Sequence, residues 1–182
     1  MKYLIDATGS RFTVQAFATG LLSTFGHNPR ISIRDFNGEI ECVPGTYEKA
    51  FVRAVVRTSA MEVQDEMKGD DRRKLEKTMY EEVLEIARFP EAVYESKQIA
   101  VEKLSSGLLL ARVQGELAFH GVTQSQSVEA RVTDLGTMLR ISGEFSLRQS
   151  DYAIKPFSFA GGALRLKDEL KFSFELVARP KE

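Results

Sequence analysis

The residues from 108 to 148 restrict the fold of this chain more than any other stretch, because apolar and polar side chains alternate through three consecutive segments. The segments are 108–121, 122–132 and 138–148, and Gly121 and Gly136 occupy the gaps. An alternation with period two is typical of a strand that is buried on one face, and glycine suits tight antiparallel turns. The stretch therefore predicts a meander of three long strands, the first with this inward set: Leu109, Ala111, Val113, Gly115, Leu117 and Phe119.

Strand-like alternation also occurs before and after this meander. A shift of the apolar phase near Asp35 predicts a β-bulge, because a one-residue slip would otherwise turn the buried face outward. A tight turn at residues 7–10 separates the first two strands. The further predicted strands cover residues 3–6, 11–16, 30–42, 51–58, 91–102 and 167–178.

Two segments change to the spacing of a helix. Residues 69–89 place Leu75, Met79 and Val83 on one side and charged residues on the others, which predicts a long amphipathic helix. It would extend about 30 Å at ~20 residues, and Pro90 would end it. Residues 19–26 predict a short helix with Thr19 as its cap.

Together these elements predict a mainly β protein. We expect a single domain over residues 1–182, built as an eight-stranded antiparallel β-barrel with one long and one short helix. Closure of the barrel removes the exposed edges that long strands otherwise present. A barrel of about eight strands is just wide enough to fill itself with side chains or to hold one small ligand.

The charge balance restricts the kinds of partner. The net charge is −1 and no basic run concentrates positive charge, which argues against a nucleic-acid partner. No apolar run approaches the ~20 residues of a membrane-spanning helix. The first residues lack the apolar core of a signal peptide, which favours a cytoplasmic protein, whereas removal of a leader would place it in the periplasm. Cys42 is the only cysteine, so no intramolecular disulfide is expected.

Residues with catalytic or metal-binding chemistry are few. His27 and His120 are the only histidines, and we expect no metal site and no cofactor. Cys42 and His27 could pair as nucleophile and base, but Cys42 falls in the apolar phase of its strand, which favours a core position. His120 precedes a turn glycine and is interpreted as a strand-end residue. We therefore expect no catalytic residue.

Small residues interrupt the inward phases of several predicted strands. A core filled by side chains is the simplest interpretation of apolar stripes, but small residues leave volume that Leu or Phe would occupy. An empty cavity costs about 24 cal/mol per Å³, and an apolar ligand would remove that cost while burying its own surface at about 25 cal/mol per Å². A filled core and a ligand cavity both remain open at these positions: Ala54, Ala111, Gly115, Ala130 and Gly143.

The order of several motifs resembles that of the YceI-like family, whose members are lipocalin-like barrels that bind polyisoprenoids and related lipids. The resemblance covers nearly the whole chain and rests on the order and spacing of the motifs together. The sequence departs from the family in two features. Gly9 stands where the family usually has a His before the Ser, and no secretory leader is recognised, although many relatives carry one. The motifs are Tyr3-Leu4-Ile5-Asp6 with Ser10, then residues 36–40, 89–96, 113–123, 145–154 and 166–178.

The resemblance implies a barrel whose interior takes an extended isoprenoid, quinone-like or fatty-acid-like chain, bound without catalysis. We expect three polar residues, His27, Arg148 and Tyr152, to hold its head group. The apolar residues expected to line the site, chosen by their phase, are Phe12, Val14, Leu21, Leu22, Phe25, Ile31, Ile33, Phe36, Met79, Val113, Phe119, Ile141, Phe145, Ile154, Phe157, Phe172 and Phe174.

Two other functions fit the same residues. An enzyme acting on an apolar substrate would place His27 or His120 inward, beside a carboxylate or Tyr152. An interaction module would have a filled barrel and would form a homodimer through a strand or the helix. The three functions differ in whether the barrel is hollow and in where the imidazoles lie.

Overall fold

The computed structural model of the chain describes residues 1–19, 28–43, 46–66, 68–162 and 164–181. Its strands are β1 (Lys2–Ile5), β2 (Arg11–Thr19), β3 (Arg30–Ile33), β4 (Phe36–Val43), β5 (Thr46–Arg57), β6 (Met61–Val63), β7 (Glu91–Ser105), β8 (Leu108–Phe119), β9 (Val122–Asp134), β10 (Leu139–Arg148), β11 (Ser158–Phe159) and β12 (Leu164–Pro180). The one α-helix in this part of the chain is α1 (Gly69–Thr78).

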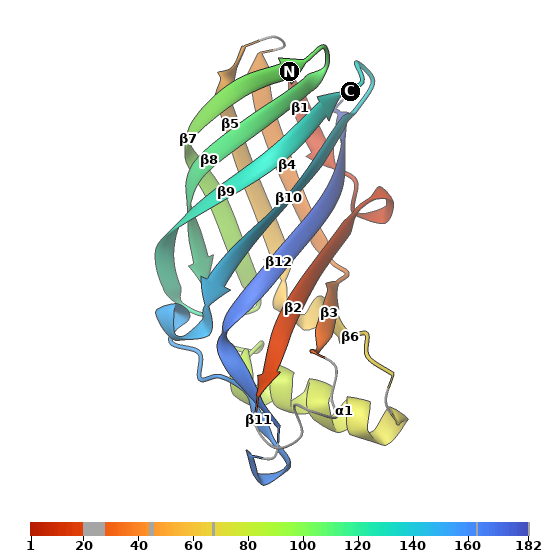
Figure 1. Ribbon diagram of the computed structural model, residues 1–182, viewed down its shortest axis with the longest axis vertical. Coiled ribbons are helices and arrows are strands. Elements are labelled where there is room, and N and C mark those ends of the chain that lie inside the picture. The colour runs from red at the N-terminus through yellow and green to blue at the C-terminus, as the bar shows by residue number, and fades with distance from the viewer. Residues whose placement is uncertain (20–27, 44–45, 67, 163, 182) are drawn as a thin grey trace.

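The sheet closes into an eight-stranded antiparallel barrel, which confirms the predicted fold class. The strand order around the barrel is β1–β4–β5–β7–β8–β9–β10–β12, and β12 pairs again with β1 (Figure 1). The predicted meander forms β8, β9 and β10, which pair in sequence. Both chain ends lie at the end of the barrel that is far from α1 (Figure 1).

At three places around the barrel, the wall consists of two strands that lie one after the other. The strand β12 pairs with β1 through residues 178–180 and with β2 through residues 165–175, so β1 and β2 follow one another along its edge. In the same way, β4 lies beside β1 and β3 lies beside β2, and then β5 lies beside β4 and β6 lies beside β3. The strands β2, β3 and β6, which we call the lower extension, reach beyond the barrel towards α1 (Figure 1).

Asp6 organises the break between β1 and β2. Its Oδ1 accepts hydrogen bonds from the backbone N–H groups of Thr8 and Gly9, at 3.1 and 3.2 Å, and from the Thr8 hydroxyl at 2.7 Å. The Thr8 hydroxyl, then the Arg179 guanidinium and the Gly9 N–H, lower the pKa of Asp6 to about 2. The predicted turn is thus confirmed, as a 3₁₀ turn at Ala7–Gly9.

The phase shift near Asp35 is a strand break, so the predicted β-bulge is wrong. The strand β3 pairs with β2 and β6, whereas β4 pairs with β1 and β5, so the chain changes partners between Ile33 and Phe36. Arg57 N–H donates to the Asp35 carbonyl at 3.0 Å and holds the corner. A bulge keeps one partner strand, whereas here both Ile33 and Phe36 stay buried because each strand keeps its own phase.

The predicted long helix is shorter than its apolar spacing indicates. The helix α1 ends at Thr78 and continues as one π-helical turn, Met79–Val83, which gives a helix of 15 residues in all. Glu85 then adopts a positive φ of 46°. A left-handed residue commonly ends a helix, so the residues before Pro90 form a turn. The predicted short helix at 19–26 lies outside the described residues except for Thr19, which ends β2.

Candidate ligand-binding site

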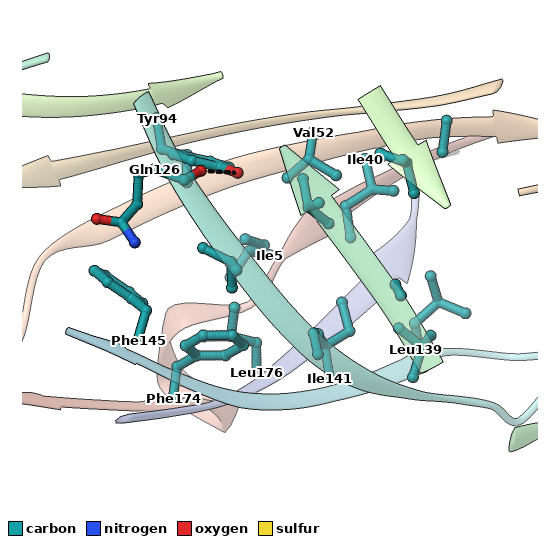
Figure 2. A pocket seen from close by; sticks show the side chains of 18 of the residues that line it. Ile5, Ile40, Val52, Tyr94, Gln126, Leu139, Ile141, Phe145, Phe174 and Leu176 are labelled. Carbon is teal, nitrogen blue, oxygen red and sulfur yellow. Dashed lines mark hydrogen bonds between the residues drawn. The ribbon is translucent and has the colours of Figure 1, made fainter. Parts of the chain in front are cut away.

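The barrel encloses a cavity of about 200 Å³, towards which side chains converge from strands on several sides (Figure 2). Three of its lining residues, Tyr47, Tyr94 and Gln126, have polar side chains, and none has a charged one. The apolar lining residues are Ile5, Phe12, Ile40, Ala50, Val52, Ala54, Val56, Ala92, Ile99, Val101, Leu109, Ala111, Val113, Leu117, Val128, Ala130, Val132, Leu139, Ile141, Phe145, Phe174 and Leu176.

Three alanines contribute to the volume of this cavity. Ala111 on β8 lies directly opposite Ala130 on β9, and Ala54 lies opposite Tyr94 across β5 and β7. All three alanines line the cavity, as their inward phase predicts. The side chains of the barrel therefore do not fill its interior. Of the two alternatives that the sequence allows, a filled core and a cavity, the structure has the cavity.

Gly115 and Gly143 do not leave free volume, which corrects the prediction for these two positions. A Cβ atom on Gly115 would lie 2.5 Å from the Tyr94 ring, and one on Gly143 would lie 2.6 Å from the Phe174 ring. Each glycine is covered by an aromatic ring from a neighbouring strand. The missing side chains let these rings approach the glycine backbone closely.

Five phenylalanines form an aromatic layer next to the cavity: Phe12, Phe36, Phe145, Phe172 and Phe174. The Phe12 ring makes edge contacts with Phe36, Phe172 and Phe174, at centroid distances of 5.8, 6.2 and 6.3 Å. Phe145 stacks on Phe172 at 4.8 Å. Each such pair contributes about 0.5–1.5 kcal/mol beyond its buried area. Phe145 borders the main cavity and Phe172 borders a second one, so the layer separates two cavities.

The second cavity, of about 80 Å³, lies between the lower extension and the helix. Leu75, Met79 and Val83 border it, so the apolar side of the helix faces inward as predicted. The Tyr80 hydroxyl donates to the Met61 carbonyl, and the Glu76 carboxylate accepts a hydrogen bond from the Val63 N–H at 3.0 Å. These bonds hold the helix on β6.

The predicted lining residues divide between the two cavities and the core. The main cavity is lined by Phe12, Val113, Ile141, Phe145 and Phe174. The second cavity is lined by Val14, Ile31, Met79, Phe119, Phe157 and Phe172. The core around the aromatic layer contains Ile33, Phe36 and Ile154. The predictions at Leu21, Leu22, Phe25 and His27 lie outside the described residues.

The polar groups of the main cavity are not those chosen from the sequence. Arg148 is exposed and, with the buried Tyr152, borders an outer groove instead of a cavity, whereas Gln126 borders both this groove and the main cavity. The sequence analysis missed Tyr47, Tyr94 and Gln126. Gln126 shares its phase on β9 with Val128, Ala130 and Val132, so the sequence places it on the inward face next to an apolar run.

The polar groups lie towards opposite ends of the cavity. Tyr94 and Gln126 lie near Phe145, away from Ile40 and Leu139 (Figure 2). Burial raises the pKa of Tyr94 to about 12, so its hydroxyl stays protonated at neutral pH. Tyr47, near the start of β5, donates to Asp134 Oδ2 at 2.5 Å, at the end of the barrel that holds the chain termini.

His120 is buried in the turn between β8 and β9. Its Nδ1 lies 3.1 Å from the Tyr152 carbonyl oxygen, and its Nε2 lies 3.1 Å from Glu85 Oε2 without the angles of a hydrogen bond. This is the carboxylate neighbour that the enzyme hypothesis predicted, but the imidazole borders neither cavity. His120 connects the β8–β9 turn to the segment after the helix, where its ring also packs on Phe89 at 4.4 Å.

Cys42 is buried, as its apolar phase predicts, and burial raises the pKa of its thiol. Within the residues that the structure describes, no group of three or more His, Cys, Asp or Glu side chains is arranged to hold a metal ion. Across the same residues, no helix has the length and apolar character needed to cross a membrane.

This architecture defines a class of protein: a closed eight-stranded antiparallel barrel around an apolar, uncharged cavity. The model of the YceI-like domain matches residues 3–178, and the chain belongs to this family, as its motif order indicates. No curated protein sequence matches the chain.

Solved structures of several bacterial proteins share the fold. Burkholderia cenocepacia BcnA is 14% identical over 95% of this chain and 98% of its own, with a TM-score of 0.74. A polyisoprenoid binding domain from Saccharophagus degradans is 15% identical over 98% of each chain, with a TM-score of 0.73. The Campylobacter jejuni YceI protein is 15% identical over 86% of this chain and 88% of its own, with a TM-score of 0.66.

Proposed function

We propose that the protein binds an amphipathic lipid with a polyisoprenoid-, quinone- or fatty-acid-like chain inside the barrel, and carries it unchanged. The main support is the lining of the main cavity, which is apolar except for three uncharged polar side chains. An apolar chain gains about 25 cal/mol for each Å² that it removes from water in such a site.

The size of the cavity favours a barrel with a bound ligand over a barrel with an empty cavity. At about 24 cal/mol per Å³, an empty space of about 200 Å³ would cost roughly 5 kcal/mol. That is a large fraction of the 5–15 kcal/mol by which native proteins are typically stable. An engineered apolar cavity of about 150 Å³ binds benzene, so this larger one has room for a branched or linear chain. A bound chain would remove most of the cost.

The aromatic layer sets the length of chain that fits. A chain confined to the main cavity would contact Phe145 and Phe174, which border it, together with Val113 and Ile141. A longer chain would reach the second cavity only if the stacked pair Phe145 and Phe172 moved apart. The polyisoprenoid binding described for the Saccharophagus degradans domain supports an isoprenoid chain among the candidates.

We further infer that binding is not coupled to catalysis. The buried His120 and its partly exposed neighbour Glu85 line neither cavity, so a bound chain would not reach them. The cytoplasmic location and the homodimer stay predictions, which cell fractionation and analytical ultracentrifugation would check.

Native mass spectrometry of the protein as purified, together with solvent extraction of its lipids, tests this function. We expect a mass excess that is released on denaturation and recovered in the extract. The variant Ala111→Phe, which places a ring in the cavity, should lose this excess. Ala100→Phe, at an exposed position of the neighbouring strand β7, is the matched control and should keep it. A wild-type protein with no excess mass and no uptake of added lipid would contradict the proposal.

A further inference from the structure

The large apolar side chains that are most exposed to water gather at one end of the barrel. In the part of the chain that the structure describes, four of them, which we call the apolar rim, are 46–60% exposed: Met1, Val43, Leu104 and Leu135. Single exposed apolar residues are normal on a protein surface. A cluster of them marks a site of interaction.

One side of the rim is formed by the start of the chain and by β4. The Cys42 N–H donates to the Met1 carbonyl at 2.9 Å, so Val43 lies beside Met1. Both chain termini lie at this end of the barrel (Figure 1). Ile40, on the same strand, lines the main cavity, so β4 connects the cavity lining to the rim.

The other side of the rim is formed by two hairpin turns. The Asp134 N–H donates to the Gly107 carbonyl at 2.8 Å, which joins the turn after Leu104 to the turn that holds Leu135. Tyr47 on β5 lines the main cavity and donates to Asp134 Oδ2 at 2.5 Å. Because β7 and β8 separate β5 from β9 in the sheet, this bond crosses the end of the barrel. The main cavity therefore ends next to the apolar rim.

Three exposed lysines accompany the apolar rim. They come from β5, from β7 and from the residue after β12, whose N–H donates to the Lys2 carbonyl at 2.8 Å. Among the side chains that the structure describes, no carboxylate lies within ion-pair distance of these lysines, which are Lys49, Lys103 and Lys181.

The carboxylates described at this end already have partners. Glu41 lies 3.3 Å from Lys2 Nζ, and Glu102 lies 3.4 Å from the Arg112 guanidinium. Asp134 accepts the hydrogen bond that crosses the end of the barrel. The charge that the described side chains leave unpaired around the rim is therefore positive.

Apolar side chains beside lysines match the surface of a bilayer that contains anionic lipids. Apolar side chains enter the boundary between head groups and acyl chains, and lysines near it are attracted by the negative surface potential. The core of a protein–protein interface is instead enriched in aromatic residues and depleted in lysine. A lipid surface therefore fits the rim better than a protein partner does.

We propose that the apolar rim docks on the surface of a bilayer that contains anionic lipids, and that the main cavity exchanges its lipid through this end of the barrel. The docking goes beyond the proposed function and requires no bound cargo. The exchange rests on the proposed function.

Flotation with vesicles tests the contribution of charge. We expect the wild-type protein to float with vesicles of phosphatidylcholine and phosphatidylglycerol, and to be released by high salt, which screens surface charge. Lys103→Ala and Lys181→Ala should each lower the partition coefficient roughly fivefold, the gain of one lysine near an anionic surface. Lys74→Ala, at an exposed position of α1 beyond the other end of the barrel, is the matched control and should leave it unchanged.

A second set of variants tests the apolar contact. Leu104→Asp and Leu135→Asp should abolish flotation, because each places a carboxylate against the bilayer. Thr123→Asp adds the same charge at an exposed position near the β8–β9 turn, at the opposite end of the barrel, and should keep it. Circular dichroism would show that all variants are folded.

The outcomes separate this inference from the proposed function. Absence of flotation, equal flotation of Leu104→Asp and wild type, or equal loss in Thr123→Asp would overturn the docking. A dimer in analytical ultracentrifugation that Leu104→Asp dissociates would assign the rim to a second copy and would overturn it too. None of these results affects the proposed function, which the lipid content of the purified protein decides. Flotation of a protein that takes up no lipid would overturn the exchange and leave the docking.

Discussion

At the residue scale, Gly115 and Tyr94 depend on each other. A Cβ atom on Gly115 would approach Tyr94 to 2.5 Å and the Glu95 carbonyl oxygen to 2.6 Å, both closer than real contacts allow. We expect Gly115→Ala to lower the free energy of unfolding by about 1–3 kcal/mol, as overpacking typically does. Urea denaturation, followed by circular dichroism, measures the change.

Gly69 provides the control for this substitution. It opens α1, and a methyl group added there would have no heavy atom within 4 Å, so Gly69→Ala should leave stability unchanged or raise it slightly. In Gly115→Ala, the further change Tyr94→Leu should restore part of the loss, because it removes the ring. If Gly115→Ala were as stable as the wild type, the ring would not lie where the structure places it.

Asp6 gives a pH dependence of known sign. Its pKa falls from 3.8 to about 2 on folding, so the folded state favours the charged carboxylate. The resulting stabilisation is present above pH 4 and is lost as the pH falls from about 4 to about 2. We expect Asp6→Asn to lower the melting temperature at pH 6 and to make the decrease below pH 4 shallower than in the wild type. Parallel curves for the two proteins below pH 4 would contradict the role of Asp6.

At this scale, sequence patterns show which face of a strand a side chain lies on, but not which side chain fills a given space in the barrel. The alternation in 108–119 correctly places Ala111 and Val113 inward. It cannot show that Tyr94, from another strand, occupies the space over Gly115, because this depends on the register of β7 and β8. The same limit explains why the sequence does not reveal that Arg148 borders an outer groove instead of the main cavity.

At the scale of elements, the helix α1 and its π-helical turn cover the lower extension. Met79 is 8% exposed and borders the second cavity, whereas Glu82 is exposed. We expect Met79→Ala to cost about 2–5 kcal/mol, because it enlarges a cavity that already exists. Glu82→Ala, in the same turn, should stay within about 0.5 kcal/mol of the wild type. Equal effects in urea denaturation would show that the turn does not pack as described.

The ends of elements are harder to predict than their existence. The strands of the meander follow from period two alone, but the break at Asp35 follows from pairing with β1 and β5, which local sequence does not encode. The helix ends early because Glu85 adopts a positive φ beside His120. That contact joins residues far apart in the sequence, so apolar spacing along the helix gives no sign of it.

At the scale of the whole molecule, the strands of the barrel differ in how many residues pair with their neighbours. The strand β1 pairs through only three residues with each neighbour, whereas β8 pairs with β9 along its whole length. We expect hydrogen exchange to be fastest, among the strands of the barrel, at β1, and slowest in β8 and β9. Mass spectrometry of exchanged peptides measures this difference. Equal protection of β1 and β8 would contradict a weak seam at β1.

The central claim is that the space inside this barrel holds an apolar chain. A crystal structure of the protein as purified, or after incubation with geraniol, tests it most directly. We predict elongated density inside the barrel, in contact with Ala111 and Ala130. A barrel in which side chains have collapsed into the cavity, with no density for a ligand, would contradict the account.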